Sequence, residues 1–212
     1  MASQYNPDDG AVYWEYRYDV GYTGWHHEGV RGILIKHFNL LNPDDKVYRV
    51  LVTMCGMSVD MDWLARQGLE VIGVDLALNA LKKFMANSGH EWTESPAPKL
   101  GPNATLFTRK DGKIKLYCGD VLDFSPDLEG KFDAVYDCYG LHAIDRALTP
   151  KFAKMIKSIL NPCGRLLLDA IAYDPKKLQD EDPDCSVHLV EKHFDIAWRG
   201  EEPFNCFLIV KK

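Results

Sequence analysis

Asp75 ends the apolar run 69–74 and stands 20 positions after Cys55, which together with Gly56 closes an earlier apolar run. An acid at the end of a second buried strand, after a first strand, a turn of small residues and a helix, is placed to accept hydrogen bonds from the ribose hydroxyls of a nucleotide-type cofactor. The spacing therefore predicts an enzyme that binds such a cofactor.

The turn between these two runs argues against a dinucleotide. A dinucleotide-binding enzyme has the pattern G-x-G-x-x-G at this turn, so that the pyrophosphate can approach the backbone. Residues 55–60 read Cys-Gly-Met-Ser-Val-Asp and contain one glycine, Gly56. We therefore expect a cofactor without a diphosphate.

Length and composition are typical of a single domain with a sizeable core, because the chain has 212 residues of which 46% are hydrophobic. The net charge is −6 and no run of Lys and Arg exceeds two residues, which argues against nucleic-acid binding. No apolar stretch reaches the ~18 residues of a membrane span, and residues 1–6 lack the features of a signal peptide. We expect a cytoplasmic protein that acts on a small molecule, without nucleic acid or membrane as a partner.

Cysteines and histidines do not form a metal-binding pattern. The six cysteines, at 55, 118, 138, 163, 185 and 206, include no Cys-x-x-Cys pair. The histidine pairs 26–27 and 188 with 193 lack the i, i+4 spacing that would place two ligands on one helix face. We expect reduced thiols and no metal.

The coarse pattern alternates strands with helices. Helices are expected between Ser58, as N-cap, and Gly68, and over 79–88 and 150–160. Strands are expected at 47–54, 69–74, 132–137 and 164–171. Between 94 and 103 the chain is rich in Pro, Gly and polar residues, and 105–107 with 114–117 predict a hairpin that leaves the main sheet before a third strand. Residues 194–199 and 204–210 predict a closing antiparallel hairpin on an otherwise parallel sheet.

Several residues along the chain form an ordered set, namely Trp14, Tyr18, Trp25-His26, Cys55-Gly56, Trp63, Gly68, 71–75, 116–118, 131–133, Asp137, 143–144 and 173–175. This set resembles the thiopurine S-methyltransferase family, which also contains thiol and halide methyltransferases, from about Trp14 to Phe194. The resemblance implies an α/β, Rossmann-like class I methyltransferase fold with a mostly parallel seven-stranded sheet, helices on both faces and a C-terminal antiparallel hairpin. It implies one methyltransferase domain over 1–212, with a flexible arm at 1–12 and an N-terminal lid or helical region at 13–45.

The resemblance further implies S-adenosyl-L-methionine as cofactor, with S-adenosyl-L-homocysteine as product. Asp75 would accept from the ribose hydroxyls, residues 54–56 would pass beneath the methionine part, Asp120 and Val121 would lie at the adenine edge, and N-terminal aromatics would form a lid over the sulfonium. The implied cofactor-binding residues are Trp14, Tyr18, Trp25, Met54, Cys55, Gly56, Asp75, Leu76, Asp120, Val121, Asp137 and Cys138. Plainer interpretations stay open, because Asp75 and Asp120 could cap helices and the aromatics could be packing residues.

One departure from the family concerns the methyl acceptor. Where the thiopurine enzymes have an Arg after the acid of the fourth strand, this chain has Cys138, followed by Tyr139 and, three positions later, His142. The Arg-dependent part of substrate binding therefore cannot be carried over, and the acceptor is expected to differ from thiopurines. The chain is also short between 175 and 187, which predicts a more open site.

Methyl transfer from a sulfonium needs little catalytic machinery, because positioning alone can supply up to ~7–11 kcal/mol. An alkyl thiol with a pKa of ~8.5 would benefit from a base, for which His26 and His142 are candidates, with Tyr139 on the substrate side. The leading hypothesis is methylation of a small thiol by a monomer. Two alternatives are N- or O-methylation of a small heteroaromatic metabolite, and a non-catalytic binding module with the same fold.

Overall fold

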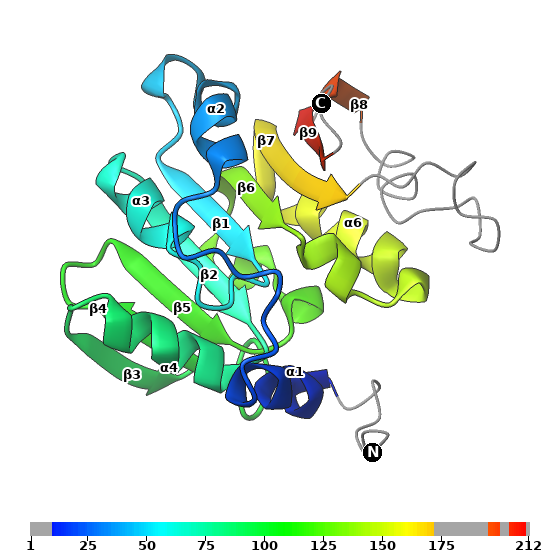
Figure 1. Ribbon diagram of the computed structural model, residues 1–212. Helices are drawn as coiled ribbons and strands as arrows, with labels where there is room; N and C mark the ends of the chain where they lie inside the picture. The colour runs from blue at the N-terminus through cyan, green and yellow to red at the C-terminus, as the bar shows by residue number, and fades with distance from the viewer. Residues whose placement is uncertain (1–9, 172–194, 200–203, 211–212) are drawn as a thin grey trace.

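The structure, a computed structural model, describes residues 10–171, 195–199 and 204–210 (Figure 1). The expected short segment at 175–187, the motif at 173–175 and the pair His188 and His193 lie outside the described residues. Among the described residues, no helix is long and apolar enough to cross a membrane.

One sheet of nine strands organises the described chain, in the order β3-β4-β5-β2-β1-β6-β7-β9-β8. Strands β5, β2, β1, β6 and β7 run parallel to their neighbours in this series, and β9 and β8 add the closing antiparallel hairpin. These seven strands are the predicted mostly parallel sheet. The bounds are β1 Arg49–Thr53, β2 Glu70–Asp75, β3 Trp92–Pro96, β4 Thr105–Arg109, β5 Ile114–Cys118, β6 Phe132–Cys138, β7 Leu160–Ile171, β8 Asp195–Arg199 and β9 Phe204–Val210.

The prediction of a hairpin outside the main sheet was wrong. Strand β5 is itself the third parallel strand, because it pairs with β2 up to Asp75 opposite Cys118. Strands β4 and β3 then continue the sheet by antiparallel pairing. Strand β3 was missed because its last four residues are exposed, so it has no alternation of apolar and polar positions. Its Pro96 is tolerated because β3 is an edge strand.

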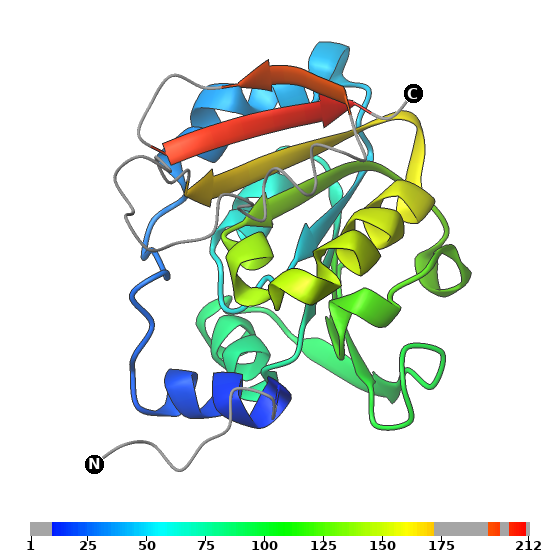
Figure 2. The same cartoon turned by 90° about the vertical axis from the view of Figure 1, so that its right-hand side faces the viewer.

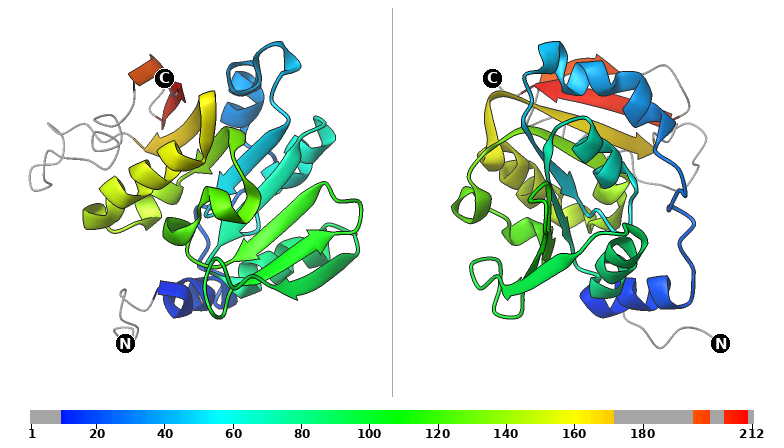
Figure 3. Two further views of the ribbon diagram at one scale, coloured as in Figure 1. Left: turned by 180° about the vertical axis from the view of Figure 1, so that it is seen from behind. Right: turned by 90° about the vertical axis from the view of Figure 1, so that its left-hand side faces the viewer.

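Helices cover both faces of the sheet, as predicted (Figures 2 and 3). Helix α6, Thr149–Ile159, packs through Phe152 and Ile156 on the face that carries Leu51 and Ile72. Three helices pack on the other face, which carries Val50 of β1. They are α2 Gly32–Leu41, α3 Asp60–Arg66 and α4 Leu78–Asn87. Because both faces are covered, the central strands are apolar throughout rather than alternating.

The N-terminal segment is fixed to the body of the protein. Helix α1, Gly10–Asp19, begins inside the range that was expected to be a flexible arm. The Asn79 amide on α4 donates to the Glu15 carbonyl at 2.7 Å and to an Asp19 carboxylate oxygen at 2.8 Å. Lys83 donates to the Tyr18 carbonyl. The segment 20–31 then passes along the sheet edge formed by the carboxyl ends of the parallel strands (Figures 2 and 3).

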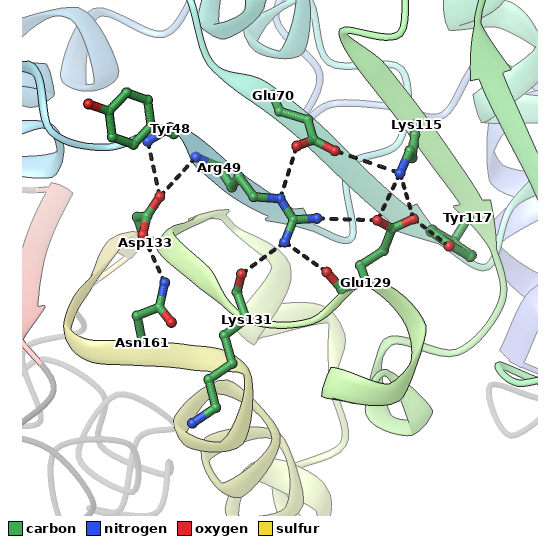
Figure 4. A network of polar contacts seen from close by, with 9 residues as sticks. All are labelled: Tyr48, Arg49, Glu70, Lys115, Tyr117, Glu129, Lys131, Asp133 and Asn161. Atoms are coloured by element: carbon green, nitrogen blue, oxygen red, sulfur yellow. Dashed lines mark hydrogen bonds and ion pairs between the residues drawn. The ribbon is translucent and has the colours of Figure 1, made fainter.

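A polar network closes the opposite edge, at the amino ends of the strands (Figure 4). Arg49, the first residue of β1, donates to Glu70 at 3.0 Å and to Glu129 at 3.2 Å. Glu129 also accepts from Lys115 at 2.9 Å and from the Tyr117 hydroxyl at 2.7 Å. Glu70 and Glu129 therefore each have a cationic partner, whereas Asp133 accepts from the backbone amides of Tyr48 and Arg49 and from the Asn161 amide.

Candidate active site

The carboxyl ends of the parallel strands meet where the strand order reverses. The chain leaves β1 to build β2 on one side and later adds β6 on the other side of β1. In open α/β sheets such a switch point is the usual place of a ligand site. The predicted residues 54–56, Asp75, Asp120 and 137–138 all follow or end these strands.

Asp75 is the last residue of β2 and is 8% exposed. One carboxylate oxygen accepts from the Gly56 amide at 2.8 Å and the other accepts from the Ala77 amide at 2.7 Å. Burial raises the pKa of Asp75 to about 6, although the hydrogen bonds from Ala77 and Gly56 work in the opposite direction. Each oxygen keeps lone-pair capacity for a hydroxyl donor. The geometry therefore allows Asp75 to accept from ribose hydroxyls, as predicted for it. It is equally consistent with the alternative role, in which Asp75 only caps the start of α4 through the Ala77 amide.

Gly56 is required by its surroundings. Its φ is +50°, and a Cβ at this position would collide with the Tyr18 hydroxyl. That hydroxyl accepts a hydrogen bond from the Trp25 indole at 3.4 Å. Burial and the nearby charge of Asp75 raise the pKa of Tyr18, so the phenol stays neutral. The structure thus brings together Tyr18, Gly56 and Asp75, three residues for which cofactor binding was predicted.

The aromatic residues of the segment 10–31, which we call the leader, form one cluster. Trp25 makes perpendicular ring contacts with Trp14 at 5.5 Å and with Tyr18 at 5.8 Å between centroids. The cluster packs on Ala77 and Ala80 at the start of α4. It lies next to the turn after β1, which is the arrangement that a lid over this turn needs.

Two of the residues with strained backbones end the central strands. Met54 follows β1 with φ +44° and Tyr139 follows β6 with φ +59°, in the left-handed region that residues other than glycine rarely adopt. Such strain is concentrated at functional sites. Neither feature is visible in the sequence.

Asp137 lies beneath this edge and is fully buried. Its carboxylate accepts from the Thr53 hydroxyl at 2.6 Å and from the Leu141 amide at 3.1 Å. Burial raises the pKa of Asp137 to about 6. The side chain braces the turn that carries Tyr139, so its predicted role as a cofactor contact is not favoured by its position.

Asp120 and Val121 follow β5 on the far side of Asp75. Asp120 precedes a short 3-10 helix, Val121–Asp123, and its carboxylate accepts from the Leu122 amide at 2.8 Å. Val121 is buried in the core that α6 covers. The Cys118 thiol contacts the Leu76 carbonyl at 3.7 Å, which places Leu76 beside this segment. The capping role accounts for one oxygen of Asp120 and leaves its adenine contact a prediction.

A cavity lies on the opposite side of Asp75, between the leader and the ends of β1 and β6. Of the predicted residues, six line it, and they are Tyr18, Trp25, His26, Met54, Cys55 and Cys138. Burial raises the pKa of the thiols of Cys55 and Cys138, so both are packed, protonated groups rather than reactive thiolates. Among the residues that the structure describes, no group of three or more His, Cys, Asp or Glu side chains is arranged to hold a metal ion.

The histidines that were candidates for a base are neutral. Burial, followed by the charge of His27, lowers the pKa of His26. Burial also lowers the pKa of His142, against the opposing effect of Asp169. His26 lines the cavity, whereas His142 lies in the 3-10 turn Gly140–Ala143 after β6. Burial raises the pKa of Tyr139, so its hydroxyl stays protonated.

The sequence interpretation missed an arginine at this site. Arg31, just before α2, donates through Nη2 to Asp169 on β7 at 2.7 Å and to the Tyr139 hydroxyl at 2.7 Å. A cation therefore reaches the neighbourhood of Cys138 from the leader, although the family's Arg at that position is missing. Asp169 offered a signal, because an acid inside the apolar run 166–171 must find a partner when buried.

Comparison with known proteins supplies the family. The model of the thiopurine S-methyltransferase family matches residues 10–201. A probable thiopurine S-methyltransferase from Danio rerio is 33% identical over 163 residues, which are 77% of this chain and 70% of that protein. Thiopurine S-methyltransferase from Bordetella petrii is 34% identical over 168 residues, which are 79% of this chain and 74% of that protein.

Solved structures agree on the fold. Magnesium protoporphyrin IX methyltransferase from Synechocystis, solved with bound S-adenosylmethionine, has a TM-score of 0.61 and 14% sequence identity, with 100% of both chains covered. At this identity the similarity concerns the fold, which is the predicted Rossmann-like class I methyltransferase fold.

Proposed function

Because the chain belongs to the thiopurine S-methyltransferase family and is an S-adenosyl-L-methionine-dependent methyltransferase, we propose that it methylates the sulfur of a small thiol. The observation that supports this most directly is a cavity next to Gly56, whose amide donates to Asp75. Cys55, Met57 and the neutral imidazole of His26 line this cavity. The family membership sets aside the alternative of a non-catalytic binding module.

The cofactor supplies a methyl group activated on a sulfonium. In our proposal Asp75 holds the ribose, the backbone of Met54, Cys55 and Gly56 supports the methionine part, and Leu76, Asp120 and Val121 surround the adenine. The residues fit this ligand, because the left-handed Gly56 has no side chain to block a close approach and Asp75 retains acceptor capacity. The Tyr18 hydroxyl lies over Gly56, so we expect this side chain to shift when the ligand binds.

On the acceptor side the chain positions the thiol and removes its proton. His26 and His142 are unprotonated near neutral pH and so are able to accept a proton from an alkyl thiol, whose ordinary pKa is ~8.5. Trp25 and Tyr139 limit access of water, which favours the combination of a thiolate with a cation because the separate charges are poorly solvated there.

Two measurements test the function. Thermal unfolding with S-adenosyl-L-methionine, S-adenosyl-L-homocysteine or NAD should show stabilisation by the first two, because a ligand of the native state raises its stability. Turnover of thiophenol, a thiopurine, sulfide, iodide and a heteroaromatic amine is then scored by the S-adenosyl-L-homocysteine formed. We expect the thiols to be the best acceptors. Turnover of the amine without turnover of any thiol would establish the N-methylation alternative.

The remaining expectations concern the protein as a whole. We propose that the enzyme is a cytoplasmic monomer that acts on a small molecule without nucleic acid. Sedimentation at micromolar concentration should give the mass of one chain, 24.1 kDa. A concentration-dependent increase to twice that mass would contradict the monomer.

A further inference from the structure

The cavity between the leader and the ends of β1 and β6 lies where the methionine part of the cofactor would reach. In the proposed function the adenine lies after β5 and the ribose at the end of β2. The strand order β5-β2-β1-β6 brings the rest of such a ligand to the ends of β1 and β6. The cavity is lined there by residues 52–55, and by Tyr136 and Cys138 of β6.

The methionine part ends in an α-amino acid, which carries an ammonium and a carboxylate near neutral pH. An ammonium has three N–H donors and no acceptor, so its burial is costly unless an acceptor of opposite charge receives it. Among the described residues that line the cavity, Asp60 is the only one with a carboxylate.

Asp60 is held firmly in the cavity wall. It is the first residue of α3 and is 1% exposed. Oδ1 accepts from the Arg31 amide at 2.9 Å and Oδ2 accepts from the Tyr136 hydroxyl at 3.2 Å. Arg31, Tyr136 and Ser58 line the cavity as well. A carboxylate has about four lone-pair sites, of which these three neighbours fill at most three, so Asp60 keeps capacity for a further donor.

The groups that donate to Asp60 carry no charge, since they are a backbone amide and hydroxyls. The Arg31 guanidinium contacts Asp169 instead, at 2.7 Å. Burial raises the pKa of Asp60, although its hydrogen bonds and the charge of Arg31 act in the opposite direction. Burial also lowers the pKa values of His26 and His27, so these imidazoles are neutral. A cation that arrives with a ligand would therefore stabilise the charged form of Asp60.

We propose that Asp60 binds the α-ammonium of S-adenosyl-L-methionine and so fixes the amino-acid end of the cofactor in this cavity. This inference rests on the proposed function, since it adds a contact to the same cofactor site. Asp75 then holds the cofactor on one side of the sulfonium, through the ribose, and Asp60 holds it on the other side. Two fixed points limit the directions in which the methyl group can face, which favours an in-line transfer.

The test measures binding by isothermal titration calorimetry. It compares S-adenosyl-L-homocysteine with its deamino analogue, in which hydrogen replaces the α-amino group. The wild type should bind S-adenosyl-L-homocysteine about tenfold or more tightly than the analogue, the effect of one charge-assisted hydrogen bond. Asp60→Asn keeps the size of the side chain but removes its charge, and it should lower this ratio by about fivefold or more.

A third ligand separates ammonium binding from support of the fold. Methylthioadenosine lacks the whole amino acid, so it has no group for Asp60 to bind. The wild type and Asp60→Asn should bind methylthioadenosine with equal affinity. If Asp60 only supported the cavity wall, its replacement would weaken binding of all three ligands alike.

A matched control lies two positions away on the same helix. Asp62 pairs with Arg109 at 2.7 Å and is not one of the residues that line the cavity. Asp62→Asn also removes a carboxylate from the first turn of α3, so it reproduces any effect of the lost charge on the helix itself. This variant should keep the wild-type ratio of the two affinities.

The contrary outcomes are distinct. A wild type that binds the deamino analogue as tightly as S-adenosyl-L-homocysteine overturns the inference without any variant, so a variant that fails to fold does not prevent the test. Asp60→Asn protein that keeps the wild-type ratio, or that loses affinity for all three ligands equally, overturns it as well, and so does an equal fall of the ratio in Asp62→Asn. If the preference for the ammonium is found as expected but the enzyme methylates no thiol, the inference holds and only the proposed methyl acceptor is wrong.

Discussion

The buried carboxylates Glu129, at the amino ends of the parallel strands, and Asp75 and Asp137, at the carboxyl ends, have different kinds of hydrogen-bond partner. At the amino ends, Glu129 accepts from both Arg49 and Lys115, so its charge is balanced by cations (Figure 4). At the carboxyl ends, Asp75 and Asp137 accept from backbone amides and one hydroxyl.

The difference appears in the pKa values at the second edge. Burial raises the pKa values of Asp75 and Asp137 to about 6 each, because amides and a hydroxyl do not offset the cost of burying a charge. Glu129 has cationic partners that Asp75 and Asp137 lack, although the division is not complete: Asp133 at the amino ends accepts from amides, and Asp169 at the carboxyl ends pairs with Arg31. Unbalanced charge at one edge is typical of a binding site.

The largest effect is expected for Asp75→Asn. The variant loses a charged acceptor for the ribose hydroxyls, which should weaken binding of S-adenosyl-L-homocysteine by about 3 kcal/mol, roughly a hundredfold. Isothermal titration calorimetry measures this affinity. Asp123→Asn, at an exposed pair with Lys151, is the control and should bind like the wild type. If the wild type and Asp75→Asn bind S-adenosyl-L-homocysteine with equal affinity, the ribose does not contact this carboxylate.

The matching change at the other edge is Arg49→Met. It leaves Glu129, whose side chain is 8% exposed, with Lys115 as its remaining cation. The free energy of unfolding in urea should fall by about 2 kcal/mol, less than for a fully buried pair because Arg49 is partly exposed. Affinity for S-adenosyl-L-homocysteine should stay unchanged in the folded protein. A loss of affinity without a loss of stability would contradict the assignment of the two edges.

The pH dependence sharpens the contrast. A carboxyl group whose pKa is raised in the folded state favours folding at low pH, and this contribution is lost as pH rises through about 6. Lowering the pH from 7 to 5 protonates Asp75 and should therefore reduce the amount by which its buried charge lowers the free energy of unfolding. Ligand affinity should move in the opposite direction and fall by up to about tenfold per pH unit below 6, because the ribose needs the carboxylate. Calorimetry between pH 5 and 8 should show this slope in the wild type and a flatter profile in Asp75→Asn.

These comparisons also explain what the sequence was able to predict. The strands before Gly56 and Asp75 were predicted correctly because they are buried on both faces and form continuous apolar runs. Strand β3 has no such run, since its pairing with β4 depends on the backbone rather than on apolar side chains. The closing hairpin was found because each of its strands is bounded by a turn signal at 200–203.

Residues of the acceptor side were harder to predict for a different reason. Arg31 stands in the segment between α1 and α2, and its role depends on a contact with Asp169 across the whole fold. The left-handed backbone of Met54 and Tyr139 is likewise imposed by tertiary packing, since neither residue type favours it. Local sequence patterns report strands and helices, whereas contacts of this kind arise only when the sheet has formed.

The smallest expected effect distinguishes a lid that recognises charge from one that only covers the site. Trp25→Leu removes an aromatic ring that contacts Trp14 and Tyr18. If the ring faces a sulfonium, affinity for S-adenosyl-L-methionine should fall by about 1 kcal/mol more than affinity for uncharged-sulfur S-adenosyl-L-homocysteine, because only the former offers a cation to the ring. Tyr48→Leu, at a side chain that is 70% exposed, is the control and should change neither affinity. Equal losses for both ligands would show that Trp25 acts by packing alone. The aromatic cluster would then stabilise the fold without recognising the charge of the cofactor.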